Sequence, residues 1–134
     1  MFCIDASVIL SAAKGTEVYS QKSTEFLEMI DRESYKIFFP EIILPEIASG
    51  LVRQTGDEKL AAEYIENLSA VSNFSFVPVD SKLTALAVKI ILKTKLRAAD
   101  ALYVALAYEY NLTLVTLDEE QLQRSAELVS VRRP

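Results

Sequence analysis

The sequence predicts one α/β domain in which helices cover both faces of a parallel sheet, giving three α/β/α layers. Short apolar or β-branched runs alternate with segments of helical period, which is the pattern of such a fold. With 51% apolar and 25% charged residues, the 134-residue chain has the composition of one globular core. We therefore expect a single domain over residues 1–134.

Five short runs have the composition of β-strands. They are Phe2 to Asp5, Lys36 to Phe39 with Pro40 as its stop, Phe74 to Val79, Thr113 to Thr116, and Leu128 to Val131. Helical segments separate them, so parallel pairing through crossovers is favoured. We expect the doubly wound order 3-2-1-4-5, in which the first strand is central.

The segments between the strands show helical periodicity. The expected helices are Ser23 to Ile30, Glu58 to Leu68 after the N-cap Asp57, a helix that Asp80 caps and that runs through Lys93, and Leu96 to Tyr110. A further helix is expected around Glu46, with Pro45 in its first turn or at a kink.

The composition limits the chemistry that this chain can perform. There is no histidine, so the usual general base near neutral pH and the imidazole metal ligand are both missing. The single cysteine, Cys3, cannot form an internal disulfide, and we expect it to pack in the core. Catalysis by this chain would therefore depend on carboxylates.

The apolar runs are far shorter than the roughly 20 residues that span a membrane. The opening MFCIDAS does not resemble a secretory signal, and we expect a cytoplasmic protein without a membrane partner. The net charge of −5 argues against RNA binding, but a cation held by carboxylates reverses the field at a substrate phosphate. Basic residues also gather before Asp100, namely Lys89, Lys93, Lys95 and Arg97.

Two acids follow strands that the expected order makes neighbours. Asp5 follows the first strand and Asp118 follows the fourth, so both emerge at adjacent carboxyl ends, where α/β sheets place their chemistry. Each acid also fits a simpler role. Asp5 can cap the next helix, and Asp118 with Gln121 matches a capping box.

Two more acids lie on expected helices. In LRAADALYVALA, Asp100 shares an apolar stripe with Leu96, Tyr103 and Ala107, so its charge needs a partner, and a structural salt bridge is an alternative to a metal. Glu46 lies in PEIILPEIASGL, where a solvated helix residue is the alternative.

Oxygen ligands without histidine or cysteine suit Mg²⁺ or Mn²⁺ rather than zinc. Such ions polarise a phosphodiester and lower the pKa of a bound water. The candidate catalytic and metal-binding residues are therefore Asp5, Glu46, Asp100 and Asp118, one of which can accept the proton of the attacking water.

Four segments in this order resemble the PIN domain family, and within it the VapC-type toxin ribonucleases of toxin–antitoxin pairs. They are CIDASVIL, FFPEIILPEIASGL, LRAADALYVALA and LVTLDEEQL, and they span nearly the whole chain. The resemblance implies an α/β/α fold, Mg²⁺ or Mn²⁺ dependence and endonucleolytic cleavage of RNA. It also implies a homodimer and inhibition by a small antitoxin protein that occupies the active-site groove.

The same resemblance implies supporting roles for other residues. Ser7 and Thr116 match hydroxyl positions near the metal, where they could bond a carboxylate or a metal-bound water. Glu41 is a second candidate for the role of Glu46, which we prefer because small residues follow it as in the family pattern.

Arg53 lies two helical turns after Glu46, and Arg97 lies just before Asp100, so either could reach an RNA phosphate. Solvated or dipole-compensating cations are the alternative for both. Tyr64 and Tyr103 occur at core-facing spacings, and we expect them to pack rather than to stack on bases.

Two other classes of function compete. A receiver-like signalling domain would need paired acids after the first strand, a phosphoacceptor Asp after the third and a Lys after the fifth, which this sequence does not offer. A PIN-fold protein acting in RNA processing or mainly by binding is the second alternative. Its partner groove would be formed by Ile9, Leu10, Leu51 and Val52, although such apolar stripes more often belong to a core.

Overall fold

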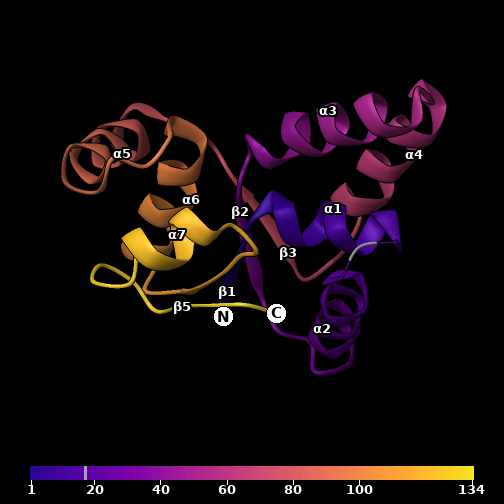
Figure 1. The fold of residues 1–134 in the computed structure, drawn as a ribbon, viewed down its shortest axis with the longest axis horizontal. Coiled ribbons are helices and arrows are strands. Elements are labelled where there is room, and N and C mark those ends of the chain that lie inside the picture. Colours follow the sequence, from indigo (N-terminus) through magenta and orange to yellow (C-terminus); the bar gives the residue numbers. More distant parts are fainter. Residues whose placement is uncertain (17) are drawn as a thin grey trace.

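The computed structural model describes residues 1–16 and 18–134 (Figure 1). In this part of the chain one sheet contains five parallel strands in the order β3-β2-β1-β4-β5. The strands are β1 (Phe2–Ile4), β2 (Ile37–Pro40), β3 (Phe74–Val77), β4 (Thr113–Val115) and β5 (Val131–Arg132). The predicted class and strand order are confirmed.

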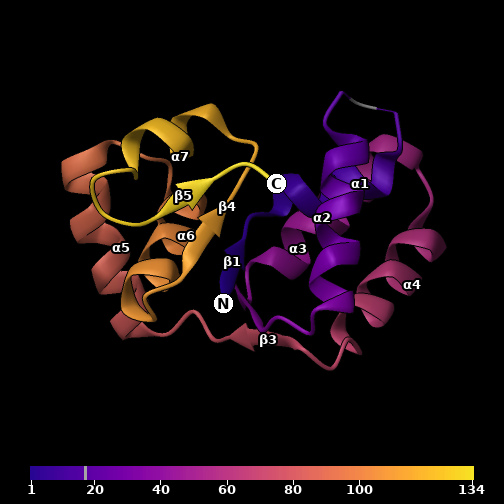
Figure 2. The same ribbon diagram turned by 90° about the horizontal axis from the view of Figure 1, so that it is seen from below.

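The helices form two layers on opposite sides of the sheet (Figures 1 and 2). One layer holds α1 (Ala6–Lys14), α2 (Ser20–Arg32), α3 (Ile43–Thr55) and α4 (Glu58–Ser69); the other holds α5 (Ser81–Thr94), α6 (Ala98–Glu109) and α7 (Glu119–Arg124). The chain steps outward from β1 to β3, then returns past β1 to β4, so right-handed crossovers place the two sets of helices on opposite faces.

The core is centred on α6, whose residues 101–107 are all buried. This helix contacts β1, β2 and β4 on one side and α5 on the other, so it needs no polar face. Cys3 is fully buried in β1, and its thiol lies 3.6 Å from the Tyr103 carbonyl oxygen, which confirms the expected packing role. Among the described helices, none combines the length and the apolar character needed to cross a membrane.

Several predicted boundaries differ from the structure. The last strand was expected at Leu128 to Val131, but the N–H groups of Leu128 and Val129 donate to the Ser125 carbonyl in a turn, and pairing begins only at Val131. The third strand ends at Val77 instead of Val79. Proline follows at position 78 and has no N–H to continue the sheet.

The two helices before β4 are also more sharply separated than the pattern predicts. Asp80 caps α5 as expected, accepting a hydrogen bond of 2.9 Å from the Leu83 N–H. Lys95 then adopts a left-handed conformation with φ of 58° and ends that helix. As a result α6 begins at Ala98, two residues later than predicted, and Asp100 lies in its first turn.

Candidate active site: an acidic pocket beside the central strands

The pairing of β1 with β4 brings the first and last of the predicted acids together. Ile4 is paired with Val115, and the Asp5 N–H donates to the Val115 carbonyl at 2.9 Å. The chain therefore leaves both strands at the same edge of the sheet. Asp5 begins α1, and Asp118 begins α7 three residues after the end of β4.

Glu46 and Asp100 complete this group, because α3 and α6 begin at the same edge of the sheet. A pocket of about 650 Å³ is lined by all four acids, together with Arg53 and Arg97. Glu41 is exposed and is not among the lining residues, so the geometry favours Glu46 over it. The four predicted acids thus share one pocket, although they lie far apart in the sequence.

All four acids lie at helix N-termini. Asp5 and Asp118 are N-caps, accepting hydrogen bonds from the Ser7 N–H at 2.9 Å and the Gln121 N–H at 2.8 Å. Glu46 and Asp100 are in the first turns of α3 and α6. Helix N-termini stabilise negative charge, so the capping roles predicted for Asp5 and Asp118 are compatible with a place in the pocket.

Tyr103 is a polar contributor that the sequence pattern assigned only to packing. Its ring is fully buried on α6, and its hydroxyl donates to Glu46 Oε2 at 2.5 Å. The spacing of three residues after Asp100 places it on the same face of α6, one turn away. That spacing was the available signal, but a tyrosine on an apolar stripe is normally a core residue.

Gln121 is the second contributor that the sequence analysis missed. Its side chain is fully buried, and its Nε2 donates to Asp5 Oδ1 at 3.2 Å and to Asp100 Oδ1 at 3.4 Å. The expected capping box is only half present. Asp118 caps Gln121 through the backbone, but the Asp118 N–H donates to Thr116 Oγ1 at 3.0 Å and not to the glutamine side chain.

Arg97 lies between two of the acids. Its Nε is 3.1 Å from Asp100 Oδ2, and its Nη2 is 3.4 Å from Asp118 Oδ2. Asp100 therefore has the structural ion pair that the sequence analysis kept as an alternative. The Arg97 side chain is 73% exposed, so this bridge contributes little to stability and leaves the guanidinium accessible to a substrate. Arg53 is also exposed where it lines the pocket.

Ser7 and Thr116 connect the start of α1 to the segment after β4. The Ser7 hydroxyl accepts from the Leu117 N–H at 3.1 Å and lies 3.5 Å from the Thr116 hydroxyl, which accepts from the Asp118 N–H. Thr116 thereby orients the backbone of one acid. Hydrogen bonding by Ser7 opposes the desolvation that raises the pKa of Asp5.

Burial and mutual repulsion set the electrostatics of the pocket. Desolvation raises the pKa of Asp5, of Glu46 and of Asp100 above their ordinary values, and repulsion from neighbouring acids adds to each rise. Opposing contributions come from Ser7 and Gln121 at Asp5, from Tyr103 at Glu46, and from Arg97 at Asp100. The pocket therefore holds an excess of negative charge that a cation would neutralise.

The donor set fits a hard divalent cation in kind. Every acidic group that lines the pocket is a carboxylate, and burial, with added repulsion from neighbouring acids, raises the pKa of Asp5, of Glu46 and of Asp100. In the arrangement described for residues 1–16 and 18–134, no three acidic or cysteine side chains converge closely enough to hold one ion. Binding would require Arg97 to leave Asp100 and Asp118 and the carboxylates to turn inward.

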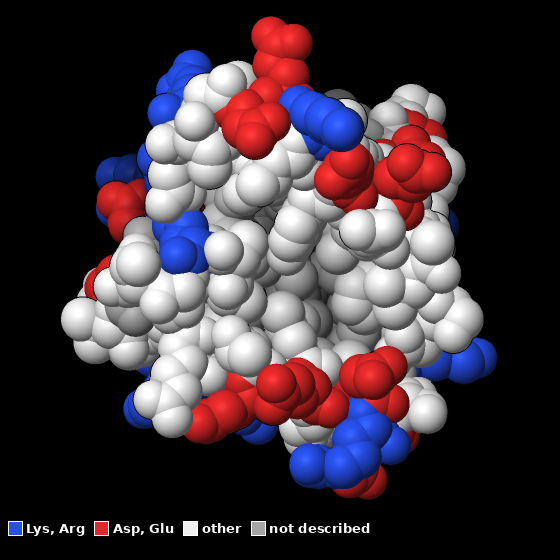
Figure 3. All heavy atoms as spheres, turned by 90° about the vertical axis from the view of Figure 1, so that its right-hand side faces the viewer, with Lys and Arg blue, Asp and Glu red and all other residues white. Residues whose placement is uncertain are grey.

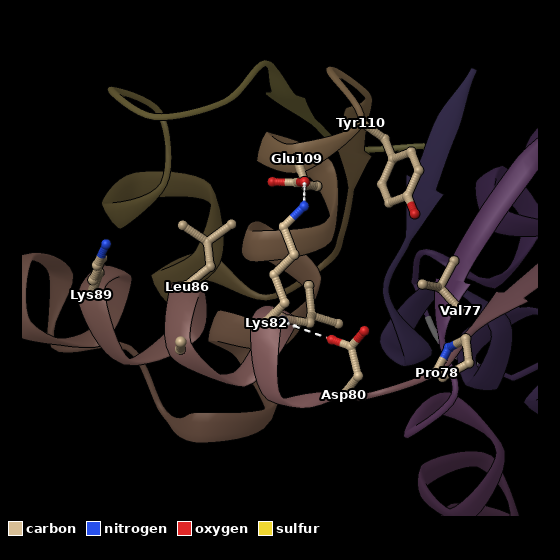
Figure 4. A pocket seen from close by; sticks show the side chains of 10 residues that line it. Val77, Pro78, Asp80, Lys82, Leu86, Lys89, Glu109 and Tyr110 are labelled. Atoms are coloured by element: carbon tan, nitrogen blue, oxygen red, sulfur yellow. Dashed lines mark hydrogen bonds and ion pairs between the residues drawn. The ribbon is translucent and has the colours of Figure 1, made fainter.

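A separate pocket of about 440 Å³ lies beside the N-terminus of α5 (Figure 4). Three of its charged groups already have partners within the protein, because Lys82 Nζ lies 2.7 Å from Glu109 Oε1 and Asp80 caps Leu83. Lys89 belongs to this pocket, whereas Arg97 is the one member of the predicted basic cluster that lines the acidic pocket. The acidic pocket is therefore the better candidate for catalysis.

The fold and the pocket together define a parallel α/β domain with an acidic site at the point where the strand order reverses. Residues 2–128 match the family model of the PIN domain, so the chain belongs to the PIN domain family. PIN domains are nucleases, which makes phosphodiester hydrolysis the class of chemistry to consider for these acids.

Solved structures show the same fold. The chain is similar to FitAcB from Neisseria gonorrhoeae, with a TM-score of 0.76, 22% identity, and coverage of 100% of this chain and 98% of that one. For VapC20 of Mycobacterium tuberculosis, a toxin that cleaves the sarcin–ricin loop, the TM-score is 0.81, the identity 14% and the coverage 100% of both chains. For VapBC2 from Rickettsia felis, bound to a DNA fragment from its promoter, the TM-score is 0.75 and the identity 14%, with coverage of 98% of this chain and 97% of that one. No curated protein sequence matches the chain.

The hydrogen bond between Tyr103 and Glu46 predicts a change in titration. In Tyr103→Phe the pKa of Glu46 should rise further, because a bond that stabilises its charged form is lost while the buried ring is kept. Carboxyl-carbon NMR of glutamate-labelled protein measures this directly. Tyr108→Phe, at an exposed position on the same helix, is the control. An unchanged Glu46 titration in Tyr103→Phe would contradict the described contact.

The raised pKa values predict how stability changes with pH. The folded state binds protons more tightly than the unfolded chain at Asp5, Glu46 and Asp100, so the free energy of unfolding contributed by these groups falls as pH rises through their raised pKa values. Asp5→Asn keeps a capping oxygen but removes a buried charge. In chelator, it should therefore be more stable than the wild type at about pH 7, and the difference should shrink near about pH 4.

Urea unfolding at the two pH values gives this comparison. Asp57→Asn, at the exposed N-cap of α4, is the matched control and should show no such pH-dependent gain. If Asp5→Asn were equally destabilised at both pH values, the carboxylate would be part of a stabilising network rather than a strained site.

Proposed function

We propose that this protein is a metal-dependent endoribonuclease and the toxin of a type II toxin–antitoxin pair, acting in the cytoplasm. The observation that carries the proposal is the meeting of Asp5, Glu46, Asp100 and Asp118 in one pocket of a PIN domain. The similar structures of VapC20 and of the FitAcB and VapBC2 complexes support the toxin class.

In this proposal the four carboxylates hold Mg²⁺ or Mn²⁺. When bound, such an ion polarises a phosphodiester and provides an activated water at neutral pH. The carboxylates orient the reacting groups, and one that is not fully neutralised accepts a proton. Arg53 and Arg97 lie at the pocket where the sugar–phosphate backbone would pass, and they bind phosphates. Arg97 would exchange Asp100 and Asp118 for the substrate.

A PIN-fold protein of RNA processing, or one that only binds RNA, is the alternative. The structure gives no specific support for a pure binding role, because all four acids are retained within a single pocket. Homodimer formation, which the family resemblance implies, is part of the toxin proposal and can be measured by analytical ultracentrifugation.

The family resemblance implies an antitoxin in the active-site groove; we propose in addition that an apolar segment of it with basic flanks docks between α1, α2 and α4. Figure 3 shows a hollow on this face with an uncharged floor, and acidic side chains with some basic ones among them lie along its edges. Its lining includes Ala12 and Ala13 from α1, Leu27 from α2 and Tyr64 from α4, with Glu28 and Asp31 beside them. A basic partner is complementary to these acids and to the net charge of −5.

The four residues that the sequence suggested for a partner groove do not form one open surface, since only Val52, which is 38% exposed, and the half-buried Leu10 are accessible. Ile9 is fully buried and Leu51 is 3% exposed, so both belong to the core. Leu10 is half-buried and lines the acidic pocket. Its side chain lies against Gly50 of α3, where α1 and α3 approach each other closely. The sequence analysis kept the core as the more usual role of such residues, because helix period does not reveal which face is covered.

The nuclease proposal predicts metal-dependent cleavage that depends on the acids. In Asp100→Asn, cutting of a mixed RNA pool with Mg²⁺ or Mn²⁺ should fall by about 100-fold or more, since a charged ligand is lost. Chelator should abolish wild-type cutting. Asp57→Asn, away from the pocket, should cut as the wild type does. Cutting that persists fully in both Asp100→Asn and Asp5→Asn would refute the assigned site.

The partner proposal predicts that a substitution in the hollow weakens binding of the partner without changing RNA cleavage. Ala13→Arg introduces bulk and positive charge at an exposed position in the hollow, so affinity for a probe peptide with an apolar centre and basic flanks should fall by about tenfold or more. RNA cleavage should be unchanged. Ala62→Arg, exposed on α4 outside the hollow lining, is the control. Equal affinities for the two variants, measured by calorimetry, would exclude this face.

A further inference from the structure

We propose that Gln121 is a positioning residue whose side-chain amide holds the carboxylates of Asp5 and Asp100 next to each other, ready for a divalent cation. The inference rests on the proposed function and assigns a role to a residue outside the four acids. It starts from an unusual feature of α7, which is a fully buried glutamine that bonds two of the pocket's acids from behind without itself lining the pocket.

The contacts of the Gln121 amide join three distant parts of the chain. Nε2 donates to Asp5 Oδ1 at 3.2 Å, to Asp100 Oδ1 at 3.4 Å and approaches the Asp100 carbonyl oxygen at 3.4 Å. Asp5 follows β1, Asp100 is on α6, and Gln121 is on α7. A neutral donor between two carboxylates reduces their repulsion without occupying the place of a cation, unlike the exposed guanidinium of Arg97.

The orientation of the amide follows from its surroundings. If the amide were turned over, its carbonyl oxygen would face two carboxylate oxygens, and acceptors cannot bond to one another. The NH₂ group must therefore face Asp5 and Asp100. The Oε1 atom on the other side is buried and has no protein partner among the described residues.

Neither helix capping nor packing requires a glutamine at this position. The cap of α7 uses only the Gln121 backbone N–H, which any residue other than proline would supply. A buried carbonyl oxygen without a partner lowers stability, and an apolar side chain of similar length would avoid that loss. The amide is thus explained by what it does to the two acids and not by its contribution to folding.

The test is Gln121→Met, which keeps the length and volume of the side chain but removes the donor. Gln123→Met is the matched control, because Gln123 lies on the exposed side of the same helix and bonds Glu119 at 3.2 Å. Three quantities are measured for the wild type and both variants. They are the affinity for Mn²⁺, by electron paramagnetic resonance; the melting temperature, in the presence of chelator; and kcat and KM for RNA cleavage.

We expect Gln121→Met to bind Mn²⁺ about 10- to 100-fold more weakly, as found when groups that orient metal ligands are removed. The loss in cleavage should appear in kcat, with KM for RNA little changed. Its melting temperature in chelator should change little, because removal of the unpaired carbonyl offsets the loss of the hydrogen bonds to Asp5 and Asp100. Gln123→Met should match the wild type in every measurement.

Two results would overturn the inference. A variant with lower melting temperature and unchanged Mn²⁺ affinity would make Gln121 a purely structural residue, and an equal loss of affinity in Gln123→Met would make the effect non-specific. If Gln121→Met does not fold, Gln121→Asn replaces it, since its shorter amide cannot reach both acids and the same loss of affinity is expected. A wild type that binds Mn²⁺ but cuts no RNA would refute the ribonuclease proposal while the affinities still test Gln121.

Discussion

The pairing of β1 between β2 and β4 is the constraint on which the rest of the structure depends. Cys3 and Ile4 are fully buried in β1, and the register of Ile4 with Val115 fixes where the chain leaves each strand. Because the strand order reverses at β1, the helices that follow β1 and β4 lie on opposite faces and leave a pocket between their first turns. The positions of Asp5 and Asp118 are direct consequences of this register.

The pocket gathers like charges, and the surrounding protein offsets their repulsion only in part. Four helix N-termini point their positive ends at the acids, and Tyr103, Gln121 and Arg97 each bond one or two carboxylates. The pKa values of Asp5 and Asp100 nevertheless stay raised. In the proposed function, the bound cation would offset this repulsion between buried carboxylates.

Helix α1 connects the acidic pocket with the hollow on the molecule's side. Its first turn, with Ser7, lines the pocket, and its last turn, with Ala12 and Ala13, lines the hollow. A protein bound in the hollow would therefore contact the same helix whose N-cap is Asp5. In the proposed function, an inhibitory partner bound in the hollow could extend along α1 to the acidic pocket without a change in the fold.

The sequence by itself determined the fold class and the strand order, and it named four acids that share one pocket, because hydrophobic period and residue type are local properties. It placed the start of β5 wrongly, since only the hydrogen bonds to the Ser125 carbonyl show that Leu128 lies in a turn and not in the strand. It also missed Tyr103 and Gln121 as polar partners. Gln121 meets Asp5 across 116 positions, and Tyr103 meets Glu46 across 57. Whether a buried tyrosine or glutamine packs or bonds depends on which distant side chain faces it, and only the tertiary structure decides that.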